Sequence, residues 1–144
     1  GTGWGGLAIY AAQNYGCKVT TTTISDAQHD YAKARIKELK LEGQITLLSQ
    51  DYRQLTGQYD KLVSIEMIEA VGDEFHATFF AKCNSLLKDT GKMLLQAITI
   101  ADQRYDHYRH NVDFIQRYIF PGGCLPSIQV ISKQVHETTD MVID

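Results

Sequence analysis

Short segments with strand character alternate with longer segments that carry a helical stripe, and this alternation limits the fold more than any other feature. Residues 19–24 are few and rich in β-branched side chains, as strands are. Over residues 73–87, apolar side chains recur at helical spacing. Strands and helices in alternation form βαβ units with parallel strands. The sequence therefore predicts an α/β fold of the Rossmann-like kind: a doubly wound, mostly parallel sheet with helices on both faces.

The other expected elements follow from the same patterns. Ser25 and Gln28 have the spacing of a capping box, so a helix is expected to start at Asp26 and to close at Gly43. Helices are also expected over residues 4–15, 102–119 and 127–137, and strands over residues 44–49, 60–66, 92–100 and from 141 onward. Residues 62–65 are expected to be buried, residues 92–100 to be covered on both faces, and residues 88–91 to form a turn.

A glycine-rich loop opens the chain. Gly1, Gly3 and Gly5 leave no side chain where a backbone turns sharply and approaches a ligand, and the helix that follows points N–H groups into the same space. A tight strand-to-helix turn without any ligand would have the same pattern. In the dinucleotide-binding fingerprint the third glycine comes later than Gly5 does here, and an acidic residue ends the second strand. Residues 23–25 of this chain contain no acidic residue. The loop therefore disfavours a nicotinamide cofactor.

Charge and composition exclude several classes of function. The net charge of −3, without a basic cluster, gives no electrostatic footprint for nucleic acid. No apolar run approaches the roughly 20 residues that cross a bilayer, and no secretion signal is evident, so a cytoplasmic location is expected. The three cysteines are far apart, and His107 and His110 lack a third ligand, so the sequence predicts neither a disulfide framework nor a metal site.

Four separated motifs narrow the function. They cover residues 1–6, 20–28, 63–72 and 114–126. In this order they resemble the cyclopropane-fatty-acyl-phospholipid synthase family, which includes the mycolic acid cyclopropane synthases and belongs to the class I S-adenosylmethionine-dependent methyltransferases. The resemblance covers essentially the whole chain. It implies an enzyme that binds S-adenosyl-L-methionine, attacks its methyl group with a cis double bond of a lipid acyl chain, and closes a cyclopropane ring after a proton is lost to a bound bicarbonate. Peripheral membrane contact by the full-length enzyme is compatible with such a substrate.

The same resemblance implies a set of cofactor-binding residues. The loop would face the methionine part of the cofactor, the end of the second strand its ribose region, and the residues after the third strand its adenine. These positions are Gly1, Gly3, Trp4 and Gly5, then Thr23, Ile24 and Gln28, then Asp51 and Tyr52. Gln28 also has an ordinary alternative, the capping box with Ser25. Asp51 and Tyr52 could equally form a surface turn.

The implied reactive centre lies in the second half of the chain. Glu69 matches the family glutamate that helps to hold the bicarbonate, with the backbone of Ile65 beside it, and Glu66 is the competing carboxylate. Gln96 stands where many members have a histidine, and an amide donates a hydrogen bond but cannot relay a proton. By resemblance, Tyr105, Tyr108, Tyr118 and residues 120–123 would cover the lipid side, although aromatic residues at helical spacing also form cores.

The position of the glycine loop at residue 1 suggests a fragment, because such a loop normally follows a buried strand. We expect residues 1–144 to be the central part of one methyltransferase domain, truncated at both ends. Loss of a central first strand would expose two neighbouring strand edges, so the isolated chain is expected to be inactive. The alternatives are a methyltransferase for another lipid or small molecule, and a catalytically inactive piece of the fold.

Overall fold

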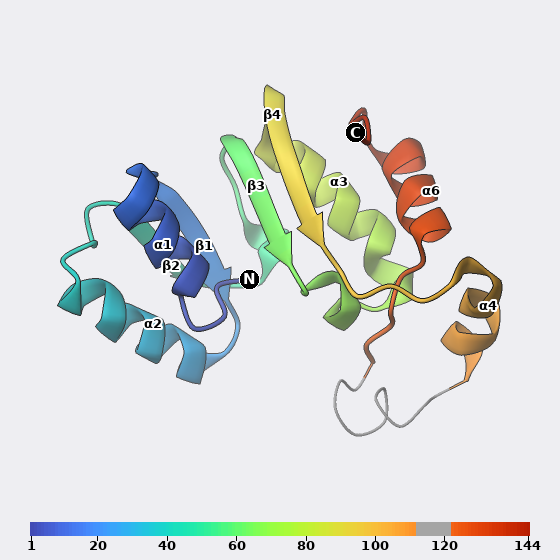
Figure 1. Cartoon of the computed structure of the whole chain (residues 1–144), viewed down its shortest axis with the longest axis horizontal. Coiled ribbons are helices and arrows are strands. Elements are labelled where there is room, and N and C mark those ends of the chain that lie inside the picture. The colour runs from blue at the N-terminus through green and yellow to red at the C-terminus, as the bar shows by residue number, and fades with distance from the viewer. Residues whose placement is uncertain (112–121) are drawn as a thin grey trace. The chain divides into compact units, whose positions relative to one another are not determined.

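A computed structural model describes residues 1–111 and 122–144 of the chain (Figure 1). The described residues form two compact units, Gly1–Leu55 and Thr56–Asp144. Tyr118, Phe120 and the second half of the helix expected up to residue 119 lie outside the described residues, as does most of the motif at 114–126. No helix in the described part of the chain is long and apolar enough to cross a membrane.

The first unit pairs two short parallel strands with two helices. Its elements are α1 (Gly6–Tyr15), β1 (Val19–Thr23), α2 (Asp26–Glu38), β2 (Ile45–Ser49) and the short 3-10 helix η1 (Tyr52–Gln54). The strands run in register from Val19 opposite Ile45 to Thr23 opposite Ser49. One apolar cluster joins both helices to β2, and its buried members are Ala8, Ala12, Ile36, Leu41 and Ile45. The small alanines allow α1 to pack closely in this core.

The second unit has the same order of strand and helix. Its elements are β3 (Tyr59–Ile65), η2 (Ile68–Ala70), η3 (Asp73–Phe75), α3 (His76–Leu86), β4 (Leu87–Gln96), α4 (Asp102–His110) and α6 (Ile128–Thr138). The strands β3 and β4 are parallel, as a βαβ unit requires. α3 packs against both strands and against α6 (Figure 1). Its buried face carries Phe79, Cys83 and Leu86 of the expected stripe, together with Phe80. The helix is shorter than the expected 73–87, because Phe75 lies on η3 and is 40% exposed, and Leu87 begins β4.

Several element boundaries differ from those expected. α1 begins at Gly6 rather than at Trp4. α2 ends at Glu38, well before Gly43, because Lys40 adopts a left-handed conformation with φ of 56°. The turn expected at residues 88–91 is part of β4, where it forms an irregularity in the register with β3. β4 then ends at Gln96 instead of residue 100, and residues 141–144 form no strand.

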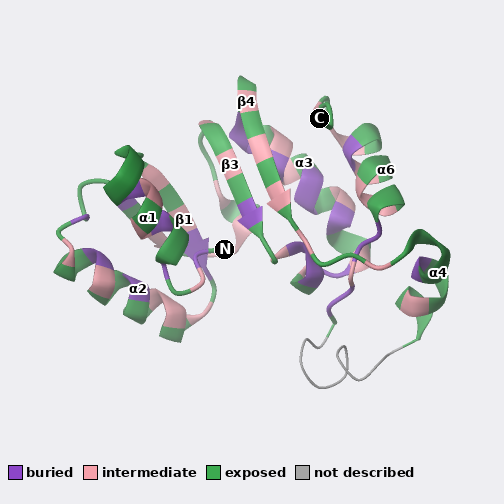
Figure 2. Ribbon diagram, in the orientation of Figure 1, coloured by how far each residue is buried: buried purple, intermediate pink, exposed green. Residues whose placement is uncertain are grey.

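The burial of β3 and β4 also differs from the prediction. Val63, Ile65 and Leu94 have exposed fractions of 44%, 42% and 56%. Figure 2 shows exposed and half-buried residues alternating along β4. The reason is that α3 packs against one face of this strand pair, and residues of alternate parity point to the other face. The prediction that residues 92–100 are covered on both faces is therefore wrong, since an apolar run in the sequence does not require cover on both faces of a strand.

Candidate active site

The glycine loop owes its shape to two glycines in the first unit. Gly3 and Gly5 have φ values of 54° and 89°, a region that favours residues without a Cβ atom. A Cβ on Gly5 would lie 3.2 Å from the Cβ of Ala32 on α2, whereas a Cβ on Gly3 would have no atom within 4 Å. Gly5 is thus required by packing, and Gly3 leaves its backbone open to a ligand.

Thr2 fastens this loop to β1, a role that the sequence analysis missed. Its backbone N–H donates to the carbonyl of Thr22 at 2.7 Å, and its hydroxyl lies 2.9 Å from that of Thr21. The carbonyl of Thr2 in turn accepts from the N–H of Gly5 at 3.0 Å. Thr2 is buried, with 8% of its surface exposed. The only signal in the sequence is a hydroxyl residue between two glycines, which is too common to be diagnostic.

The first turn of α1 suits a negatively polarised ligand group. Gly5 is the N-cap residue and supplies no side-chain acceptor, and the first turn contains no acidic residue. Helix N-termini carry a partial positive charge on their N–H groups. The loop and the start of α1 therefore form a surface on which a carboxylate or another oxygen-rich group could bind.

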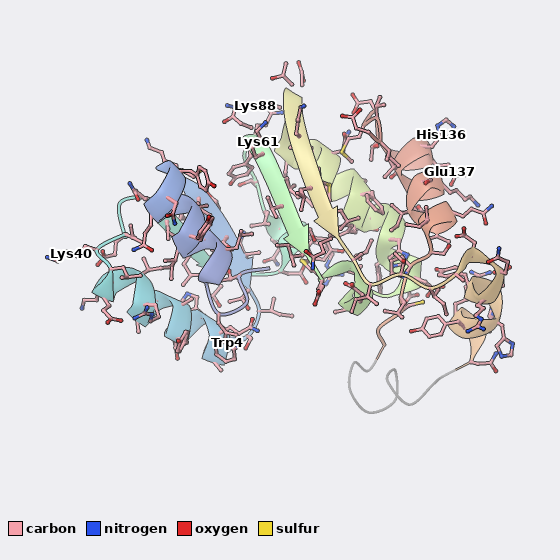
Figure 3. All side chains as sticks on the ribbon, viewed as in Figure 1. Trp4, Lys40, Lys61, Lys88, His136 and Glu137 are labelled. Atoms are coloured by element: carbon pink, nitrogen blue, oxygen red, sulfur yellow. The ribbon has the colours of Figure 1, made fainter. Side chains whose placement is uncertain are left out.

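Trp4 and Ile24 present exposed apolar surface in the first unit. Their exposed fractions are 58% and 78%. The Trp4 ring packs edge-on against Tyr31, with 5.4 Å between centroids, and is labelled in Figure 3. Tyr31 fixes one edge of the indole and leaves most of the ring in solvent. Such surfaces suit contact with an apolar or aromatic part of a ligand.

Thr23, Ser25 and Gln28 form one network at the end of β1. The Ser25 hydroxyl accepts from the backbone N–H of Gln28 at 3.3 Å, which confirms the N-cap. The Thr23 hydroxyl donates to Oε1 of Gln28 at 2.9 Å and accepts from the N–H of Ser25 at 3.1 Å. The expected capping box is therefore closed through Thr23 rather than directly by Gln28. The Gln28 amide nitrogen is not used in this network and can face a ligand.

Asp51 is occupied by its neighbour Arg53. Its carboxylate accepts from the backbone N–H of Arg53 at 2.9 Å, from Nε at 2.9 Å and from Nη2 at 2.7 Å. The hydrogen bond from the Arg53 side chain, followed by that from its backbone, lowers the pKa of Asp51. Asp51 also caps η1, which begins at the half-buried Tyr52. This geometry is that of the surface turn, and contact with adenine stays a prediction.

Glu69 is the buried carboxylate of the second unit. It lies on η2, after β3, with 7% of its surface exposed. Its Oε1 accepts from the backbone N–H of Ile98 at 2.5 Å, while Oε2 is buried and has no hydrogen-bond partner among residues 1–111 and 122–144. A buried carboxylate oxygen without a donor is costly in a folded protein. Glu69 is therefore a candidate to bind a ligand through Oε2.

Glu66 and Gln96 pair with each other. Gln96 donates from Nε2 to Oε1 of Glu66 at 3.0 Å, and the N–H of Glu66 donates to the carbonyl of Gln96 at 2.9 Å. Glu66 is exposed and has a φ of 49°, an uncommon conformation for a residue with a Cβ. Of the two competing glutamates, only Glu69 is buried. Ile65, expected beside it, ends β3 and is 42% exposed.

His76 is a buried residue that the sequence analysis did not single out. It begins α3 with 1% of its surface exposed, and in the described part of the chain neither ring nitrogen has a partner at hydrogen-bonding geometry. Burial lowers its pKa, while the nearby Asp73 and the Ile68 backbone oppose that shift. A single histidine between acidic and apolar residues gives no recognisable sequence signal. Within the described ranges, no group of three or more His, Cys, Asp or Glu could hold a metal.

Of the tyrosines expected on the lipid side, the structure describes Tyr105 and Tyr108, and both contribute to packing within the second unit. Tyr105 on α4 is buried, and burial raises the pKa of its hydroxyl. Tyr108 is half-buried, and its hydroxyl accepts from the N–H of Leu125 at 3.4 Å. These contacts join α4 to residues 122–126. They agree with the alternative that aromatic residues at helical spacing serve packing.

The sequence of this chain is similar to those of known proteins over most of its length. The model of the mycolic acid cyclopropane synthetase family matches residues 1–144. The cyclopropane-fatty-acyl-phospholipid synthase of Escherichia coli is 44% identical over 134 residues, which are 92% of this chain and 33% of that protein. The tuberculostearic acid methyltransferase of Mycobacterium tuberculosis is 42% identical over 131 residues, 91% of this chain and 30% of that protein.

A solved structure shows the same fold. The crystal structure of a mycolic acid cyclopropane synthase complexed with SAH and CTAB has a TM-score of 0.88 and 28% identity to this chain. The matched region covers 100% of this chain and 54% of the chain in the crystal structure. The chain spans about a third of the length of the curated relatives named above. Because the family model matches all of residues 1–144, the chain belongs to the mycolic acid cyclopropane synthetase family, whose fold is that of the class I S-adenosylmethionine-dependent methyltransferases.

Proposed function

We propose that this protein acts as a cyclopropane-fatty-acyl-phospholipid synthase-type methyltransferase on the cis double bond of a lipid acyl chain. The observation that carries the proposal is Glu69, a buried carboxylate with one oxygen bonded to Ile98 and the other without a partner. A cyclopropane-forming enzyme must remove a proton from a carbon cation, and a dry carboxylate suits the handling of that proton. The relatives named for cyclopropane synthesis and fatty-acid methylation support the same chemistry.

The first unit would hold S-adenosyl-L-methionine, and its residues fit this group. The open backbone at Gly3 and the uncapped start of α1 suit the carboxylate of the methionine part. The Gln28 amide is free to meet a ribose hydroxyl, and Trp4 and Ile24 offer apolar surface. The bound cofactor supplies an electrophilic methyl group. The protein's own task in this unit is to orient that group, and Asp51 and Tyr52 are proposed only as neighbours of the adenine.

The second unit would manage the proton. Glu69 is proposed to orient a small proton-accepting ion such as bicarbonate through its unpartnered Oε2, and Ile65 to line the same place with its backbone. Gln96 fits this task less well, because one of its two amide N–H groups is already donated to Glu66. It can hold an acceptor with the remaining N–H group but cannot relay a proton. Removal of the proton therefore depends on Glu69 and the ion rather than on Gln96.

The test is a lipid analysis of cells that express the natural gene product in a bacterium unable to make cyclopropane fatty acids. We expect cyclopropane fatty acids with the wild-type protein and about 100-fold less with Glu69→Gln, in the range for loss of a group that handles protons. Glu137→Gln is the matched control, since Glu137 is exposed on α6. Wild-type levels of product from Glu69→Gln would refute the role of Glu69. Unchanged host lipids with the wild-type protein would refute the substrate.

A second candidate is methylation of a lipid without ring closure. Gln96 favours it, because it is bound to Glu66 and is not titratable, so the carbon cation could lose its proton from a neighbouring chain carbon instead of from the transferred methyl group. That loss leaves a methyl-branched chain with a new double bond and closes no ring. Among the relatives, the tuberculostearic acid methyltransferase and sphingolipid C9-methyltransferases carry names of this kind. Methyl-branched unsaturated fatty acids in place of cyclopropane products in the same experiment would decide for this candidate.

A cytoplasmic location with peripheral membrane contact is part of either proposal.

A further inference from the structure

Glu69 is held by two chain segments that are themselves joined. Its side chain accepts from Ile98, two residues beyond β4, and its backbone carbonyl accepts from the N–H of Cys124 at 2.8 Å. The N–H of Ile100 donates to the carbonyl of Pro126 at 3.0 Å. Residues 122–126, which we call the brace, therefore touch both the backbone of Glu69 and the segment that binds its carboxylate. A shift of the brace would move Glu69 from two sides.

Gly72 permits the close approach of this brace. A Cβ atom on Gly72 would lie 3.2 Å from the carbonyl oxygen of Gly122, tighter than ordinary packing. Gly72 also has φ of 85° and ψ of 147°, a conformation that is essentially restricted to glycine. The contact occurs at the first residue of the brace, two positions before Cys124. Any side chain at position 72 would push the brace away from η2, where Glu69 lies.

We propose that Gly72 is a positioning residue for Glu69 and acts through the brace. The inference rests on the proposed function, in which Glu69 orients the proton-accepting ion. A Cβ on Gly72 would require the Gly122 carbonyl to give way by a few tenths of an ångström. Because a misplacement of about 1 Å can reduce turnover by about 100-fold, a smaller shift should reduce turnover by a smaller factor. Gly72 and Glu69 both belong to the second unit, whereas the proposed cofactor-binding residues belong to the first, so we expect the effect of Gly72 on turnover rather than on cofactor binding.

The experiment compares Gly72→Ala with the wild-type natural gene product. We expect kcat to fall by about 3-fold to 10-fold, with the affinity for S-adenosylhomocysteine unchanged within about 2-fold by calorimetry. Gly16→Ala is the control for backbone strain, since Gly16 has a φ of 63° and its added Cβ would meet no atom within 4 Å. We expect this control to lose stability but to keep its kcat.

A double variant separates positioning from general damage. If Gly72 acts through Glu69, Gly72→Ala combined with Glu69→Gln should be no slower than Glu69→Gln alone. Amide hydrogen exchange at Cys124 and Ile98 should also become faster in Gly72→Ala. Additive losses of kcat, or unchanged exchange at both amides, would overturn the inference. Unchanged turnover in Glu69→Gln would instead overturn the proposed role of Glu69, so the two failures are distinguishable.

Discussion

The glycine loop and Glu69 are held in place by different kinds of contact. Thr2 joins the loop to β1 through partners 19 and 20 positions along the chain, and the Thr23–Gln28 network spans five positions. Glu69 depends on Ile98, 29 positions away, and on the still more distant Cys124. The loop can therefore form from one strand and two helices of the first unit. Glu69 reaches its position only when three segments of the second unit pack correctly.

The two regions also differ in what they leave for a ligand. In the first unit, Asp51 has both carboxylate oxygens bonded by Arg53, and the open positions are backbone groups at Gly3 and the start of α1. In the second unit, the open positions are side-chain atoms, among them Oε2 of Glu69 and the ring nitrogens of His76. A backbone site tolerates most side-chain changes around it. A site that depends on one carboxylate is sensitive to any change that moves that residue.

Substitution of Gly5 should break the first region most severely. In Gly5→Val, the added side chain meets Ala32 at a position where φ is 89°, so overpacking and backbone strain act together. We expect the free energy of unfolding to fall by about 3 kcal/mol and S-adenosylhomocysteine affinity to fall more than about 10-fold. Urea unfolding and calorimetry measure the two effects. Gly6→Ala, which meets no neighbouring atom, is the stability control, and an equal loss there would refute the packing argument.

Loss of the Thr2 hydroxyl should have a smaller effect on the same region. Thr2→Val keeps the shape and the backbone bond to Thr22 but removes the contact with the Thr21 hydroxyl. We expect about 1 kcal/mol less stability, the usual value for one partly buried hydrogen bond. Thr2→Val and Thr21→Val remove the same contact. The double variant should therefore lose about as much stability as either single variant, and less than the sum of the two losses. Fully additive losses would show that the two hydroxyls act independently.

The same contrast explains what could be predicted from sequence. The capping of α2 by Ser25 and the glycine loop are encoded by residues close together in the chain, and both were expected correctly. These features follow from local rules for caps, turns and strand ends.

Features that depend on distant packing could not be predicted in this way. Lys88 to Gly91 carry turn residues, but they lie within β4 because Leu87 before them and Lys92 after them both pair with β3. The exposure of Val63 and Leu94 depends on which elements cover the strands, not on their own hydrophobicity. The brace on Glu69 and the Thr2 anchor depend on contacts that no spacing in the sequence reveals.

A change of pH should test the second region through His76. Burial places its folded-state pKa below the unfolded value of about 6.5, so the neutral ring is favoured in the native state. Its contribution to stability is fully present above pH 6.5 and is lost as the pH falls below that value. Thermal unfolding at pH 7.5 and 5.5 should therefore show a smaller decrease for His76→Phe than for the wild type. Equal decreases would mean that His76 does not titrate on unfolding in this range.

The smallest effect is expected at Asp51, where the pair with Arg53 lies near the surface. The hydrogen bonds from Arg53 lower the pKa of Asp51 in the folded state, so its stabilising effect exists above the unfolded pKa of about 3.8 and is lost as the pH falls through the folded value. Asp51→Asn should therefore reduce stability slightly at pH 7 and leave it nearly unchanged near pH 2. Arg53→Gln should show the same trend, and the double variant should add little. If Asp51→Asn instead weakens S-adenosylhomocysteine binding while Arg53→Gln does not, Asp51 contacts the cofactor and is more than the cap of η1.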